Sequence, residues 1–216
     1  MTGTITRIEP VLPPGGPEPE GAGEDHPMRR VTRQVAFEPG GWTPERRAKV
    51  AELFDDLAPE WHTRITDERL DVVVDALDRG SIATGPGTVA VEVGSGTGFA
   101  TPVLAARVGT VLAVDLALEM LRRAPAGVGH RVLADAATLP VAAGRADAVV
   151  LVNALLFPAE IDRVLAPDGT VVWVSSLGPR TPIYLSVDEV VAALPGRWHA
   201  VCSSAGWATW CAARRA

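Results

Sequence analysis

Glycines recur at every second position directly after an apolar, β-branched run in this sequence. The run Val89–Val93 carries one acidic residue, Glu92, and leads into the glycine segment Gly94–Gly98. Such a run is typical of a buried strand, and the glycines indicate a turn at which side chains would obstruct a close approach. Because the next segment, Phe99–Arg107, has the pattern of a helix, the turn predicts a site for an anionic or polar ligand at a helix N-terminus.

The spacing of the glycines distinguishes between kinds of nucleotide ligand. A dinucleotide fingerprint would place its third glycine at position 99, where this chain has Phe99. The next apolar run, Thr110–Val114, ends at Asp115. An acidic side chain at the end of a second strand, ~20 residues beyond the first glycine, is where α/β nucleotide-binding units hold a ribose. A carboxylate suits this role because it accepts hydrogen bonds from both ribose hydroxyls.

The glycine pattern resembles motif I of the class I S-adenosylmethionine (SAM) methyltransferases. The segment Ala134–Phe157 resembles motifs II to IV of the small-molecule members of that family. The segment Ile161–Val174 is similar to the helix, Pro-x-Gly turn and fifth strand that follow there. The resemblance covers about residues 50–213. It implies SAM as the cofactor and a Rossmann-like, doubly wound α/β sheet of seven strands, mostly parallel with the last strand antiparallel.

The resemblance also implies roles for single residues. Asp135 would accept the adenine amino group, the backbone N–H of Ala136 would serve a ring nitrogen, and Asn153 would face the methionine part of SAM. Leu116 and Met120 would pack on the adenine, or else belong to the core of the second helix. The cofactor-binding residues expected in this way are Glu92, Gly94, Ser95, Gly96, Thr97, Gly98, Asp115, Leu116, Met120, Asp135, Ala136 and Asn153.

Three zones follow from the composition of the chain. Residues 1–27 hold six of the eighteen prolines, together with glycines and acids, and are predicted to be disordered. Residues 28–86 are expected to form an N-terminal helical cap over the cofactor pocket, with helices starting at Thr43-Pro44 and spanning Thr66–Arg79. Residues 87–216 are expected to form the SAM-binding core.

Methyl transfer from a sulfonium is an in-line displacement that depends mainly on proximity and alignment. A general base is needed only where the acceptor must lose a proton. His62 and Tyr184 are the candidates, because both lie in connections expected near the pocket. The alternative for His62 is a polar surface or capping residue, and the neighbouring Trp61 either packs on a ligand or fills the core. No metal is expected, since Asn153 stands where a metal-dependent enzyme would want a carboxylate.

Charge and cysteine content restrict the partners. The net charge of −6, the pI of about 5.2 and the lack of a basic, aromatic-rich cluster argue against nucleic acid and favour a small-molecule substrate. No run is long and apolar enough for a membrane span, and no signal peptide is recognisable, so a cytoplasmic protein is expected.

Cys202 and Cys211 have neither zinc spacing nor a nearby histidine and are expected to be free, buried thiols. The apolar stripe of the N-terminal helices offers a face for a homodimer.

The sequence therefore leaves three functions open. The first is a SAM-dependent methyltransferase acting on O, N or C of a small metabolite. The second is a methyltransferase-fold enzyme with other chemistry, such as cyclisation. The third is a non-catalytic SAM-binding module.

Overall fold

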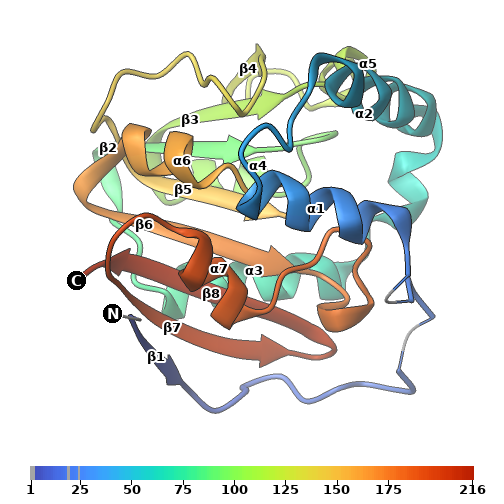
Figure 1. Ribbon diagram of the computed structural model, residues 1–216. Helices are drawn as coiled ribbons and strands as arrows, with labels where there is room; N and C mark the ends of the chain where they lie inside the picture. The colour runs from blue at the N-terminus through green and yellow to red at the C-terminus, as the bar shows by residue number, and fades with distance from the viewer. Residues whose placement is uncertain (1–2, 19, 24) are drawn as a thin grey trace.

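One sheet of eight strands runs through the computed structural model, which describes residues 3–18, 20–23 and 25–216 (Figure 1). The strands, in chain order, are β1 (Thr4–Arg7), β2 (Gly85–Val93), β3 (Val108–Asp115), β4 (His130–Leu133), β5 (Ala146–Val152), β6 (Leu165–Ser175), β7 (Trp198–Ala205) and β8 (Ala208–Arg215). β8 is antiparallel to both of its neighbours, and the other described pairings are parallel.

Helices cover both faces of this sheet (Figure 1). They are α1 (Pro27–Phe37), α2 (Pro44–Leu57), α3 (Asp67–Arg79), α4 (Thr101–Ala105), α5 (Leu118–Arg123), α6 (Pro158–Val164) and α7 (Val187–Ala193), with 3-10 helices η1 (Ala58–Arg64) and η2 (Gly178–Arg180). Buried residues of α1, α6 and α7 belong to one apolar cluster, and those of α3 and α4 to a second. The apolar runs of the central strands are therefore buried on both faces, as parallel sheets require. In the part of the chain that is described, no helix has the length and apolar character needed to cross a membrane.

The strand order β1-β7-β8-β6-β5-β2-β3-β4 places the start of the winding in the middle of the sheet. The chain passes outward from β2 through β3 to β4, then returns to β5 on the other side of β2. In open α/β sheets, ligands bind beyond the carboxyl ends of the strands at such a reversal. The glycine segment follows β2 directly, so the topology puts it at this point.

The sequence predicts seven strands and a disordered segment 1–27. Both predictions are wrong for the same reason, which is that residues 4–7 form an eighth strand. β1 lies within that segment and pairs with β7 in parallel from Thr4↔His199 to Arg7↔Cys202. The pairing continues past β1, where Ile8 donates its N–H to the Cys202 carbonyl at 2.9 Å. β7 would otherwise be an edge strand with unpaired backbone groups, and the N-terminal segment satisfies them. A strand held in this way takes its hydrogen bonds from a distant partner, which local composition does not encode.

The helices before β2 follow the predicted capping signals. Thr43 accepts a hydrogen bond from the Arg46 N–H and Pro44 occupies the first turn of α2, as predicted. α3 spans Asp67–Arg79 against the expected Thr66–Arg79. The helix expected over Phe99–Arg107 is shorter, because α4 covers only Thr101–Ala105.

The two cysteines lie directly opposite one another on β7 and β8, and both are free and buried, as predicted. Burial raises the pKa of Cys211 to about 12. This thiol therefore stays neutral near pH 7 and is a poor nucleophile.

Candidate functional site

The glycine loop after β2 requires a backbone that only glycine adopts easily. Gly94, Gly96 and Gly98 have φ values of +66°, +56° and +74°. A side chain at such angles strains the backbone. Gly94 has a second constraint, because a Cβ there would lie 2.8 Å from the Ala154 Cβ. The loop therefore presents its backbone, not its side chains, to the space beyond β2.

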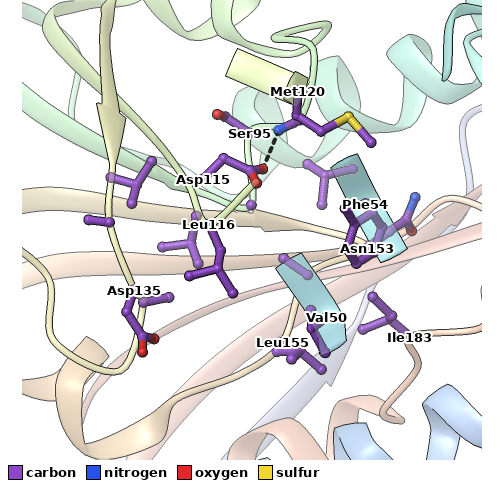
Figure 2. Close-up of a pocket in the computed structure, with 18 of the residues that line it drawn as sticks. Val50, Phe54, Ser95, Asp115, Leu116, Met120, Asp135, Asn153, Leu155 and Ile183 are labelled. Atoms are coloured by element: carbon purple, nitrogen blue, oxygen red, sulfur yellow. Dashed lines mark hydrogen bonds between the residues drawn. The ribbon is translucent and has the colours of Figure 1, made fainter. Parts of the chain in front are cut away.

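Asp115 fixes this loop from the end of the neighbouring strand, β3. Its Oδ2 accepts a hydrogen bond from the Gly96 N–H at 2.7 Å (Figure 2). Its Oδ1 accepts one from the Ala117 N–H at 2.8 Å. Burial raises the pKa of Asp115, and these backbone donors oppose the shift. A carboxylate offers about four acceptor positions, so two lone pairs remain for a ligand. The residue predicted to hold ribose thus also orders the glycine loop.

Glu92 lies behind the loop and not in the pocket that the loop faces. Its side chain is buried and accepts a hydrogen bond from the Thr101 hydroxyl at 2.6 Å. Burial, with a smaller contribution from the charge of Asp115, raises the pKa of Glu92 to about 7. We infer a structural role for Glu92, in which it ties the end of β2 to α4.

We expect the Glu92→Gln variant to lose the pH dependence of stability that Glu92 causes. The folded pKa of about 7 lies above the ordinary value of 4.5, so the wild type loses stability as pH rises from about 4.5 to 7. The loss amounts to roughly 3 kcal/mol at most. Urea denaturation of both proteins across this range measures it. Parallel stability curves for the two proteins would contradict the assignment.

Asp135, just beyond β4, is held by an aromatic side chain from the segment before α2. The Trp42 Nε1–H lies 3.0 Å from both carboxylate oxygens, and the Ala137 N–H donates to Oδ1 at 2.9 Å. Trp42 also packs edge-on against Phe157, with ring centroids 5.3 Å apart. The carboxylate predicted to bind adenine is therefore oriented by a residue of the N-terminal segment and by the turn after β4.

Asn153 ends β5 in a left-handed conformation, with φ of +52°. Its amide Nδ2 donates to the Ser176 hydroxyl at 2.8 Å, and its Oδ1 accepts from the Ser176 N–H at 2.9 Å. Asn tolerates this conformation better than most residues. Its amide joins the ends of β5 and β6, which keeps the floor of the site in place.

A pocket opens over these strand ends, and the space within it, open solvent at its mouth included, is about 930 Å³. In Figure 2, Asp115 and Asp135 extend from the strand ends, and Val50 and Phe54 of α2 lie nearby. Of the expected cofactor-binding residues, those that line the pocket are Gly94, Ser95, Gly96, Asp115, Leu116, Met120, Asp135, Ala136 and Asn153. Glu92, Thr97 and Gly98 do not appear in its lining.

Most of the remaining lining is apolar and was not expected from the sequence. These other lining residues include Trp42, Val50, Phe54, Ile65, Phe99, Leu155, Phe157 and Ile183, and also the charged Arg69. Trp61, for which the sequence left ligand packing and core packing open, also lines the pocket. A Cβ at Gly96 would lie 3.6 Å from the Trp61 Nε1, so this indole lies close to the glycine loop.

The two predicted bases do not join the residues around the pocket. His62 is exposed, and its Nδ1 lies 3.2 Å from the Pro59 carbonyl oxygen within η1. Tyr184 is half-buried beneath the Arg29 guanidinium, 5.0 Å from its ring centroid. A general base must reach the proton that it removes. This geometry gives neither residue support as a base.

The residues of the pocket fit SAM. The adenosine has carboxylates at two strand ends, a loop of exposed backbone and apolar walls beside them. The Ser95 hydroxyl is buried without a hydrogen-bond partner among the described residues. Buried polar groups without partners are rare, so this hydroxyl is free to bind a polar ligand atom beside the loop.

Comparisons with known proteins agree with this site. Residues 91–173 match the family model for a methyltransferase domain. A SAM-dependent methyltransferase from Aquifex aeolicus superimposes with a TM-score of 0.55 at 20% identity, over 80% of this chain and 98% of that chain. That likeness shows the shared fold.

Two further solved structures match over shorter stretches. A chain of the Haloferax volcanii complex that contains the Trm112 methyltransferase activator matches at 22% identity and a TM-score of 0.47, over 56% of this chain and 59% of that one. Geranyl diphosphate C-methyltransferase from Streptomyces coelicolor matches at 19% identity and a TM-score of 0.43, over 48% of this chain and 43% of that one. The matches thus span less than two thirds of these two chains.

No curated protein sequence matches the chain. The family model covers the glycine loop, Asp115, Asp135 and Asn153, the residues around which the pocket is built. The chain therefore contains a methyltransferase domain over residues 91–173, with S-adenosylmethionine as its cofactor.

Proposed function

We propose that the protein transfers the methyl group of SAM to a small-molecule acceptor. The observation that supports this most strongly is the pocket, whose walls combine carboxylates at strand ends with aromatic and aliphatic side chains from the N-terminal helices. Apolar walls with few polar groups are typical of small-molecule sites. The overall charge of −6 makes a nucleic-acid substrate unfavourable.

We infer that α2 and η1 act as the cap predicted for residues 28–86. Val50 and Phe54 of α2 and Trp61 of η1 all contribute to the pocket. Phe54 and Trp61 pack edge-on, with ring centroids 5.7 Å apart, so the two elements present one aromatic surface. An acceptor bound beneath it would be shielded from water, which favours a displacement at carbon by limiting hydrolysis and misalignment.

SAM supplies an electrophilic methyl group on a sulfonium. The protein's part is to hold the acceptor in line with it. Among the described residues that line the pocket, the titratable side chains are Arg69, Asp115 and Asp135. Both carboxylates accept hydrogen bonds from the protein itself. We therefore propose an acceptor that needs no protein base, such as a neutral amine, a thiolate or another group already deprotonated near pH 7.

A methyl-transfer assay tests this function. The purified protein is incubated with SAM labelled in its methyl group and with panels of amines, thiols, phenols and carboxylic acids, then with protein and nucleic-acid fractions. We expect transfer to one small-molecule class. Transfer only to a macromolecule would refute the small-molecule proposal. SAM binding without transfer to any class would instead favour the cyclising enzyme or the SAM-binding module.

The His62→Ala variant distinguishes the two interpretations of that residue. Because the ring is exposed and outside the pocket lining, we expect normal affinity for SAM and normal turnover with the acceptor found above. A pH–rate profile measured beside the wild type is the most direct readout. Loss of turnover at unchanged SAM affinity, with loss of one limb of the pH–rate profile, would show that His62 is the base after all.

A further inference from the structure

Arg69 differs in charge from the rest of the pocket wall. It is the third residue of α3, it is half-buried, and its side chain borders the same cavity as Trp61 and the glycine loop. Among the described lining residues it is the single cation, and the two anions there are Asp115 and Asp135. The space beside this guanidinium therefore favours an anion, whatever the charges of the two carboxylates at the strand ends.

The guanidinium of Arg69 has no anionic partner in the protein. No carboxylate of residues 3–18, 20–23 or 25–216 lies within 4.0 Å of it, and no acceptor among them hydrogen-bonds to it. Two other half-buried arginines are paired with carboxylates: Arg107 binds Asp78 at 2.8 Å, and Arg215 binds Asp162 at 2.9 Å. Arg69 therefore retains all five of its N–H donors for a ligand.

Holding a cation at this position is unfavourable in the absence of a ligand. Burial lowers the pKa of Arg69, and the charge of nearby Arg64 adds to the effect. The first turn of a helix is also the end at which its dipole disfavours positive charge. Each of these three costs falls when an anion binds to the guanidinium. The position of the residue thus indicates a role in binding.

We propose that Arg69 binds a carboxylate within the pocket. A planar guanidinium matches a carboxylate with two parallel hydrogen bonds, which makes this ligand chemistry specific. Two molecules can supply the group: SAM, through its amino-acid end, or the methyl acceptor, through an acid group. The second case rests on the function proposed above and would make the acceptor an apolar carboxylic acid.

Calorimetric titration of four proteins separates the two sources. The proteins are the wild type, Arg69→Gln, Arg69→Lys and the control Arg30→Gln, whose residue is exposed on α1 and does not line the pocket. The first pair of ligands is S-adenosylhomocysteine and 5′-methylthioadenosine. The two share adenosine and a thioether, but the second lacks the amino-acid end.

If the cofactor supplies the carboxylate, Arg69→Gln weakens the binding of S-adenosylhomocysteine by roughly tenfold or more. The affinity for 5′-methylthioadenosine stays unchanged. Arg69→Lys falls between the wild type and Arg69→Gln, because it keeps the charge without the planar fork. Arg30→Gln binds both ligands as the wild type does.

If the acceptor supplies the carboxylate, the Arg69→Gln variant binds S-adenosylhomocysteine and 5′-methylthioadenosine as the wild type does. A second titration then tests binding of an acid to the protein. Benzoate then binds the wild type saturated with S-adenosylhomocysteine, and Arg69→Gln loses that binding, whereas neutral benzamide shows no such dependence. Two results overturn the proposal. In the first, Arg69→Gln loses affinity for S-adenosylhomocysteine and 5′-methylthioadenosine equally, which would mean that Arg69 has a structural role. In the second, the binding of none of these ligands depends on Arg69. Carboxylate binding through Arg69 without methyl transfer by the wild type would refute the proposed function alone.

Discussion

The Gly96→Val variant is expected to bind no SAM at concentrations that saturate the wild type, while its fold persists. Gly96 has φ of +56°, a conformation that costs a non-glycine residue about 1–3 kcal/mol and a β-branched one more. The added Cβ would point toward Trp61, across the pocket that both residues line. The side chain would therefore occupy the ligand's space. Backbone strain at position 96 would also displace the N–H that donates a hydrogen bond to Asp115.

Gly87→Val is the matched control for this substitution. Gly87 lies in β2, the strand that leads into the glycine loop, is exposed, and has nothing within 4 Å of the position of a Cβ. We expect this variant to bind SAM as the wild type does. Calorimetry measures affinity, and circular dichroism with thermal unfolding verifies the fold of both variants. Wild-type affinity in Gly96→Val would show that the glycine loop is not part of the cofactor site.

Replacing Asp115 by alanine is expected to weaken SAM binding by roughly 1–3 kcal/mol, the usual range for hydrogen bonds to a charged group. Part of the loss would be direct, since the carboxylate lies at the strand end where a ribose is expected. Part would be indirect, because the Gly96 and Ala117 N–H groups would both lose their acceptor. Asp115→Asn separates the two parts, since it keeps the shape and one acceptor oxygen.

Asp147→Ala serves as the control for Asp115→Ala. Asp147 also accepts a backbone N–H, that of Val89, at 2.8 Å, but it lies near the amino end of β5, away from the pocket. We expect this variant to lose stability and to keep its SAM affinity. If both variants lowered the affinity equally, or if Asp115→Ala did not lower it at all, the assignment of Asp115 to the cofactor would be wrong.

The central strands and the glycine loop were predictable because their signals are local. The runs that became β2, β3 and β5 are mostly apolar, and each ends at a glycine or a polar residue. Gly94, Asp115 and Asn153 mark those ends. In a parallel sheet these ends lie along one edge, so chain order alone predicts that they meet.

The edge strand β1 and the apolar pocket wall were not predictable in the same way. β1 depends on the backbone of β7, almost two hundred positions later in the chain, and its proline-rich surroundings point to disorder. Val50 and Phe54 lie on the apolar stripe of α2, and a stripe that faces a pocket has the same spacing as one that faces a core. Trp42 reaches Asp135 across 93 positions, a pairing that no local pattern reveals.

Arg69 shows a different limit. Its position in the first turn of a helix is visible in the sequence, as is its disagreement with the helix dipole. What the sequence does not show is whether a carboxylate elsewhere in the chain pairs with it. Only the fold, which brings the first turn of α3 to the pocket, reveals a cation there without such a partner.

Calorimetric titration of the wild-type protein with SAM and with S-adenosylhomocysteine tests the cofactor site most directly. We expect both to bind at one site with micromolar affinity, because they share the adenosine and amino-acid groups for which the pocket provides partners. Absence of binding by either ligand would contradict the assignment of this pocket to SAM and, with it, the proposal of methyl transfer.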